Sequence, residues 1–171
     1  MSEKTYDLVI DDIKSRARWE TRQGLWYQMR TDGLRRKVKP WPNASDFHFP
    51  LVDTTINKLK PAFFQQAMGL DVLATFVPMR SQMAGFTTAA EHWFSYKLHE
   101  KSNYATEVMS WIDHMLVSGH SVMKTFWDPD TKQVEFQAVD PMYVIVPPWT
   151  KDISTADRIT QVMPMSLESY K

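Results

Sequence analysis

The stretch that most constrains the fold is residues 104–146, because it predicts a helix that passes directly into two antiparallel strands. Apolar residues recur there at three- and four-residue intervals, which places them on one stripe of a helix: Val108, Trp111, Ile112, Met115 and Leu116. Gly119 follows where a left-handed residue ends such a helix, and residues 122–127 then alternate in the two-residue period of a strand.

Residues 128–131 have the sequence Asp-Pro-Asp-Thr, which is typical of a tight turn because proline fixes φ and aspartate bonds its own backbone. Beyond the turn, Val134, Phe136 and Ala138 line one face of a returning strand. We therefore expect the helix and the β-hairpin to share one hydrophobic core.

The N-terminal region predicts one long helix over residues 6–30, with an apolar stripe that comprises Tyr6, Val9, Ile10, Ile13 and Ala17. Its second half carries aromatic and arginine side chains, and a basic loop with a Trp-Pro sequence follows. One possibility is that the helix packs on its own domain and the basic loop is solvated, with Trp41 tucked into the core; the other is that these residues contact a neighbouring subunit. The interface that we predict comprises Trp19, Arg22, Trp26, Arg35, Arg36, Lys37 and Trp41.

The middle of the chain predicts two further helices. The first begins at Pro50, ends at Gly69 and is expected to kink or break at Pro61, and its proposed apolar face comprises Val52, Ile56, Leu59, Phe63 and Ala67. A short strand over residues 72–77 follows. The second helix begins at a capping box, Thr88 with Glu91, and runs to Lys101, with an apolar face of Ala90, Trp93, Phe94 and Leu98.

After the hairpin, short strands are expected over residues 143–146 and 158–163. The fold class is therefore α+β: a long N-terminal helix, a kinked second helix, and a helical pair packed on a small antiparallel sheet. We expect two parts, residues 1–49 with the helix and the basic loop, and residues 50–171 with the α+β domain. Because the sequence from Pro164 predicts a helix start with only one turn of chain left, we expect a fragment of something longer.

The sequence lacks the common catalytic and metal motifs. There is no cysteine, and the five glycines form no phosphate-binding loop. His99-Glu100 begins a zinc-binding H-E-x-x-H motif, but Asn103 stands where its second histidine is required, and His92 and His99 have no obvious third ligand. Four aspartates would suit a divalent-metal hydrolase if they converged: Asp128, Asp130, Asp140 and Asp152. Three of them sit in turn contexts, where aspartate is expected anyway, and we favour that interpretation.

The formal net charge is zero, which argues against a strongly basic nucleic-acid binder. Residues 1–41 nevertheless hold ten Lys and Arg against six Asp and Glu, so a nucleic-acid-binding module that uses the basic loop from Arg35 to Trp41 stays an alternative. No apolar run approaches the roughly 20 residues that span a bilayer. We expect a soluble protein without a cleaved signal peptide.

Several of these pieces, in this order, resemble the N-terminal part of portal proteins, the head-to-tail connectors of tailed bacteriophages. The pieces are the aromatic and arginine-rich residues 18–27, the Trp-Pro-Asn-Ala-Ser sequence from Trp41 to Ser45, and the Phe49-Pro50 pair. Later pieces are the helix with Trp111, the segments 117–122 and 124–128, and Val139-Asp140-Pro141 with Val144. Together they cover about residues 16–165.

This resemblance implies a structural subunit rather than an enzyme, with no cofactor. Portal proteins form dodecameric rings at one capsid vertex of the virion, assembled in the host cytoplasm, and DNA passes through the central channel during genome packaging and ejection. The matched region resembles the wing. The implied partners are further copies of the chain, capsid and scaffolding proteins, the DNA in the channel, and a terminase that would bind regions beyond this chain. No membrane is implied.

Overall fold

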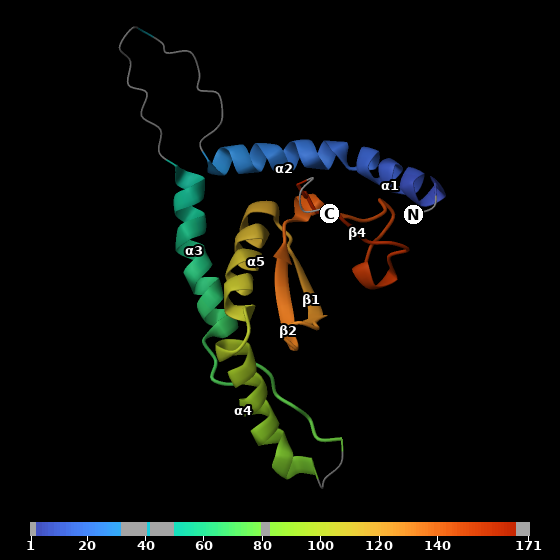
Figure 1. The fold of residues 1–171 in the computed structure, drawn as a ribbon. Helices are drawn as coiled ribbons and strands as arrows, with labels where there is room; N and C mark the ends of the chain where they lie inside the picture. The colour runs from blue at the N-terminus through green and yellow to red at the C-terminus, as the bar shows by residue number, and fades with distance from the viewer. Residues whose placement is uncertain (1–2, 32–40, 42–49, 80–82, 167–171) are drawn as a thin grey trace. The chain divides into compact units, whose positions relative to one another are not determined.

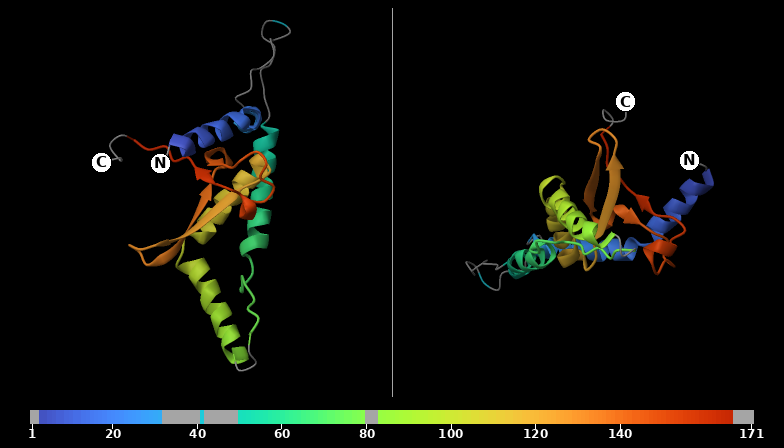
Figure 2. Two further views of the ribbon diagram at one scale, coloured as in Figure 1. Left: turned by 90° about the vertical axis from the view of Figure 1, so that its right-hand side faces the viewer. Right: turned by 90° about the horizontal axis from the view of Figure 1, so that it is seen from below.

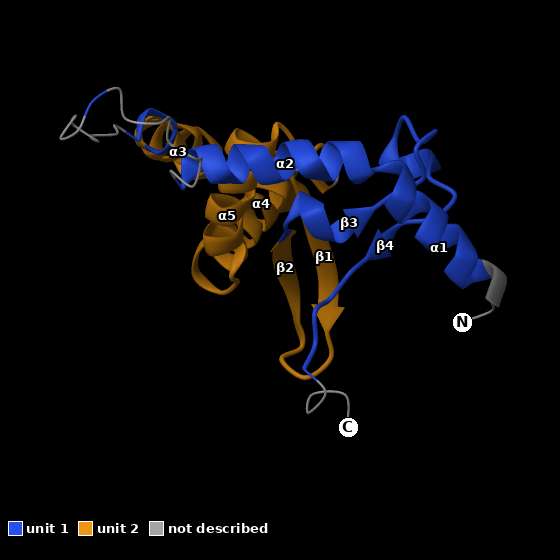
Figure 3. Cartoon of the chain, turned by 90° about the horizontal axis from the view of Figure 1, so that it is seen from above, with its two compact units in different colours: residues 1–53, 139–171 blue, residues 54–138 orange. Residues whose placement is uncertain are grey.

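A computed structural model describes residues 3–31, 41, 50–79 and 83–166. This part of the chain contains five α-helices and two small two-stranded antiparallel sheets (Figure 1), which confirms the α+β class. The chain divides into two compact units, residues 1–53 with 139–171, and residues 54–138 (Figure 3). The division therefore differs from the expected boundary at residue 49, because the C-terminal segment belongs with the N-terminal helices. No helix among the described residues has the length and hydropathy needed to cross a membrane.

The second unit contains the predicted helix and hairpin. Helix α5 (Tyr104–Ser118) ends at Gly119, whose φ of 77° is left-handed, and β1 (Val122–Asp128) pairs with β2 (Gln133–Val139). Because a side chain on a left-handed residue is strained, glycine is the residue that ends this helix with least cost. The helix, its glycine stop and the hairpin are all confirmed.

One hydrophobic cluster joins these elements. Val108 and Ile112 of α5 are buried with Met68. Trp111 and Leu116 of α5 and Met123 of β1 pack against this cluster. Tyr104 also packs there, and its ring meets that of Phe136 on β2 edge to face, with 4.7 Å between the centroids. The helix and the hairpin therefore share one core, as predicted.

Polar side chains from the start of α5 cover part of the outer edge of β2. The Asn103 amide donates to the carbonyl of Phe136 at 2.6 Å and accepts from its N–H at 3.1 Å, and a Glu107 carboxylate oxygen accepts from the N–H of Ala138 at 2.6 Å. Asn103 and Glu107 are about one helical turn apart, which advances about 5.4 Å, and Phe136 and Ala138 are two strand residues apart, about 6.8 Å. These spacings are similar enough for both side chains to bond the backbone of β2. The hairpin continues past this point to an exposed turn (Figure 2).

Helix α3 (Leu51–Met68) runs through Pro61 without a break and ends at Gly69, so the expected end is confirmed and an interruption is excluded. The proposed apolar face is confirmed at Ile56 and wrong elsewhere, because Val52, Leu59, Phe63 and Ala67 are exposed. The inner face continues from Ile56 at four-residue intervals, with Lys60 and Phe64 half-buried and Met68 buried. Lys60 belongs to this face because its amine lies 3.0 Å from a carboxylate oxygen of Asp113 on α5.

Helix α4 spans Ala84–Glu100, so it begins before the predicted capping box. Glu91 instead accepts from the N–H of Phe76 at 2.7 Å, and the Ser95 hydroxyl accepts from the N–H of Leu73 at 3.1 Å. Residues 72–77 do not form the predicted strand, because side chains of α4 rather than a neighbouring strand bind these backbone groups.

The first unit begins with two helices, α1 (Glu3–Ser15) and α2 (Ala17–Arg30), where one long helix was predicted. Arg16 separates them, with φ −95° and ψ 1°. Its guanidinium donates to the carbonyls of Val144 at 2.5 Å and Met142 at 2.6 Å, so the side chain at the break fixes the C-terminal segment.

That segment contains two 3-10 turns, η2 (Pro141–Tyr143) and η3 (Ile153–Thr155), and two short strands, β3 (Val144–Ile145) and β4 (Thr160–Gln161). The strands pair antiparallel, with Val144 opposite Gln161 and Ile145 opposite Thr160. Both lie inside the ranges in which strands were predicted. A bidentate ion pair ties the segment to α1, since the Arg158 guanidinium lies 2.7 and 2.8 Å from the two carboxylate oxygens of Asp12.

Candidate interaction surface

The predicted interface residues on α2 are accessible to different degrees. Trp19 is half-buried, with the Arg16 guanidinium 4.9 Å from its ring centroid, whereas Arg22 is exposed and Trp26 is 37% exposed. Full burial of both tryptophans in one chain would have contradicted an interface role, and that arrangement is not found. Their contact with a neighbouring subunit stays a prediction.

The predicted loop residues divide into two groups. Arg35, Arg36 and Lys37 lie outside the residues that the structure describes. Trp41 is described and is 64% exposed. The alternative reading of this tryptophan, that it is tucked into the core, is therefore wrong for Trp41.

Large apolar side chains are also exposed around the start of α4. A hollow of about 300 Å³ is lined there by Phe76, Val77, Pro78, Met79, Met83, Phe86, Thr87 and Ala90. Flexible methionines beside aromatic rings adapt readily to an irregular partner surface. Met79 and Met83 are both exposed, and exposed apolar side chains gathered in this way favour a contact with a partner surface.

The apolar side chains of the described residues lie mostly outside the core. The buried hydrophobic residues are Ile56, Met68, Val108, Ile112, Val139 and Ile145. Exposed large hydrophobic residues outnumber them several-fold and include seven aromatic residues of the second unit: Phe63, Phe76, Phe86, Trp93, Tyr96, Phe126 and Trp127. Scattered exposed apolar residues are ordinary in proteins, but concentrations of them mark contact surfaces.

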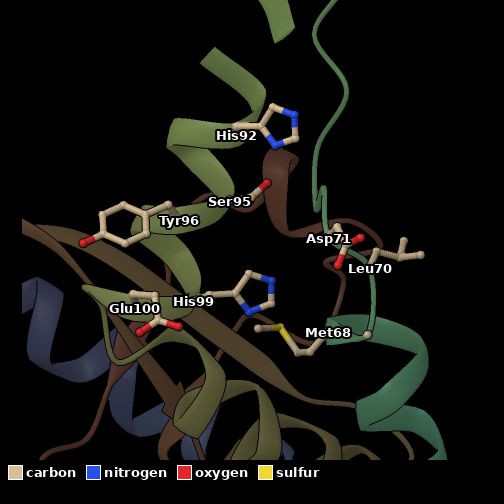
Figure 4. A pocket seen from close by; sticks show the side chains of 9 residues that line it. Met68, Leu70, Asp71, His92, Ser95, Tyr96, His99 and Glu100 are labelled. Carbon is tan, nitrogen blue, oxygen red and sulfur yellow. The ribbon is translucent and has the colours of Figure 1, made fainter. Parts of the chain in front are cut away.

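Another hollow, of about 430 Å³, lies between the start of the α3–α4 connection and one side of α4. Figure 4 shows His92, Ser95 and His99 on that side of the helix, directed toward the segment that carries Leu70 and Asp71. The two histidines thus share one side of α4. Within the described residues no group of three or more His, Asp or Glu side chains is arranged to hold a metal ion.

Three of the four aspartates considered for a metal site accept hydrogen bonds from nearby residues in turns. Hydrogen bonds from the Thr131 hydroxyl, and then from the Asp130 amide, lower the pKa of Asp128. Hydrogen bonding by Ser154 likewise lowers the pKa of Asp152. The carboxylate of Asp140 accepts from the N–H of Met142 at 2.8 Å. These geometries explain Asp128, Asp140 and Asp152 as turn residues and favour that interpretation over metal-dependent hydrolysis.

Two features of the structure are absent from the predictions made from the sequence. The pair of Arg158 and Asp12 joins residues 146 positions apart, and no local spacing signals such a contact. The second is a groove beside α4, to which Trp93, Lys97 and Lys101 contribute. Their four-residue spacing places them along one side of a helix and was visible in the sequence.

Comparisons with known proteins identify no family for this chain. No family model matches it, and no curated protein sequence is significantly similar to it.

Proposed function

We propose that this chain is a structural subunit of a phage portal ring at the capsid vertex, where the ring forms the channel for genome packaging and ejection. The order of sequence pieces between residues 16 and 165 motivates the proposal. The structural observation that carries it is the excess of exposed over buried large apolar side chains. A protein that works as a ring subunit needs contact surfaces of this kind.

The chemistry of the exposed residues agrees with subunit contacts. Aromatic residues, Met and Arg are enriched at protein interfaces, and α2 presents Arg22, Trp26 and Met29 on its exposed surface. In a ring, each subunit contacts its neighbours through two different patches, because head-to-tail contacts close by rotation. The α2 residues and the apolar hollow at the start of α4 are two such patches, one in each unit.

The turn roles of the aspartates also fit a subunit whose work is mechanical. A portal subunit requires no nucleotide-binding loop of its own, since a separate terminase supplies the hydrolysis of ATP in that family. The five glycines of this chain form no such loop.

Electron microscopy of the full-length product tests the proposal directly. We expect rings with a central hole, and a single large species in sedimentation velocity. Trp26→Asp is expected to reduce assembly by placing a charge in the contact, whereas Lys151→Asp, at another exposed position of the same unit, is the control. A monomer at high protein concentration, without rings, contradicts the proposal. DNA affinity with a steep salt dependence, again without rings, would favour the nucleic-acid-binding alternative.

A further inference from the structure

A groove of about 360 Å³ lies within the second unit, between α4 and the distal half of the β1–β2 hairpin. Its apolar lining includes Phe94 and Leu98 from the helix and Val134 and Phe136 from β2. The groove shares no lining residue with the apolar hollow at the start of α4, and none of its lining residues belongs to α2.

The walls of the groove are held by packing. Phe94 meets Phe76 edge to face, with 5.6 Å between the ring centroids, and Phe136 meets Tyr104 at 4.7 Å. Two tryptophans from different elements complete the lining, Trp93 of α4 and Trp127 of β1, and each is 61% exposed. Anchored walls with exposed tryptophans at the rim are the features of an interface hot spot that needs little reorganisation on binding.

The charge along the groove has one sign. Lys97, Lys101 and Lys132 line it, and none of its lining residues is an aspartate or glutamate. The amine of Lys97 lies 5.8 Å from the ring centroid of Trp93, which holds one positive charge beside the apolar surface. An occupant that fits these walls must therefore be apolar at its centre and negative at its edges.

Lys132 occupies a position where lysine is disfavoured. Its φ is 52°, and it is the residue other than glycine with positive φ among the described residues. Glycine or asparagine adopts this left-handed conformation at lower cost. The hairpin turn thus retains a positive side chain at the groove in place of the residue that would stabilise the turn.

We propose that this groove binds an acidic peptide segment of a partner protein, with a bulky apolar residue between the tryptophans and carboxylates at the lysines. The lining is mostly apolar, which favours a protein side chain over a nucleotide, whose phosphate and sugar require polar contacts. This proposal does not depend on ring formation.

The probe is a short fluorescein-labelled peptide with a tryptophan–leucine pair flanked on both sides by glutamates, and fluorescence anisotropy is measured with the full chain. We expect saturable binding that weakens as salt increases. Replacement of the flanking glutamates by lysine, or of the central pair by serine, is expected to weaken binding at least about tenfold. Trp127→Ser and the double variant Lys97→Gln/Lys101→Gln should each do the same.

Lys132→Gly separates binding from folding. It is expected to raise the thermal midpoint, because glycine relieves the left-handed backbone, and at the same time to weaken peptide binding. Lys124→Gln, which removes a positive charge from the same hairpin outside the groove, should leave the affinity within about twofold.

Three outcomes would overturn the proposal. The first is no saturable binding of the glutamate peptide, or equal weakening by Lys124→Gln. The second is that an oligothymidylate binds in a Trp127-dependent manner while the peptide does not, which would identify a site for single-stranded nucleic acid. The third is Trp127-dependent self-association without peptide binding, which would identify a second copy of the chain as the occupant.

Discussion

Replacement of Asn103 by alanine should release the outer edge of β2 from α5. The amide makes two hydrogen bonds with the backbone of Phe136, at 2.6 and 3.1 Å. Each bond contributes about 1 kcal/mol net, and the half-buried peptide groups left behind add a desolvation cost, so we expect a loss of about 2–3 kcal/mol. No N-cap hydrogen bond is lost, because the Asn103 side chain makes none to the start of α5.

Amide hydrogen exchange at Phe136 is the assay, because it reports on this edge rather than on the whole chain. A loss of 2–3 kcal/mol corresponds to exchange that is about 30- to 150-fold faster. Gln137→Ala is the matched control, since this exposed residue lies on the same strand and its replacement should change exchange little. If Asn103→Ala and Gln137→Ala give the same exchange rate at Phe136, the hydrogen bonds between Asn103 and Phe136 do not stabilise the hairpin.

Three further predictions concern other contacts. Arg158→Ala should lower the thermal midpoint more than the double variant Arg158→Ala/Asp12→Asn, because Asp12 is 2% exposed and the single change leaves its carboxylate unpaired; the opposite order in a thermal melt contradicts this reasoning. Thr131→Val should raise the pKa of Asp128 in an NMR titration, because it removes the hydroxyl that donates to the carboxylate. Since the pKa of Asp128 is lowered in the folded state, the stability that this turn contributes is present above about pH 4 and is lost as the pH falls through the folded-state pKa. Gly69→Ala should destabilise by about 1–3 kcal/mol in urea unfolding, because the new Cβ would lie 2.4 Å from a backbone carbonyl oxygen one turn earlier; an unchanged midpoint would show that the helix end can relax.

Local patterns predicted the elements whose structure depends on local interactions. The helix that ends at Gly119 and the turn at Asp128 follow from the conformations that glycine, proline and aspartate favour. The core of Val108 and Ile112 follows from helical periodicity. These features need no information from distant residues.

The errors arose where a distant residue decides the local conformation. No residue near Arg16 signals a break between α1 and α2. The break occurs at Arg16 itself, whose side chain donates hydrogen bonds to the carbonyls of Val144 and Met142. Residues 72–77 have the composition of a strand, but α4 provides their hydrogen-bond partners. On α3, the pair of Lys60 with Asp113 explains why a charged residue lies on the inner face.

The surface was harder to predict than the fold. A tryptophan at helical spacing indicates a buried face, yet Trp93 is exposed at the groove while Phe94 and Leu98 beside it are half-buried. Sequence periodicity gives the direction of a side chain around the helix axis but does not say whether another element covers it. The groove between α4 and the hairpin therefore could not be predicted as a binding surface from periodicity alone.

The bond between Asp12 and Arg158 sets an order of events during synthesis. At a ribosomal rate of roughly 5–20 residues per second, the 146 positions between the two residues correspond to a delay of roughly 7–30 s. Residues 54–138 are continuous and can fold as they emerge. During this delay, α1 and α2 are on the nascent chain while Asp12 has no Arg158 to pair with. They are therefore accessible to chaperones before their partner segment has been translated.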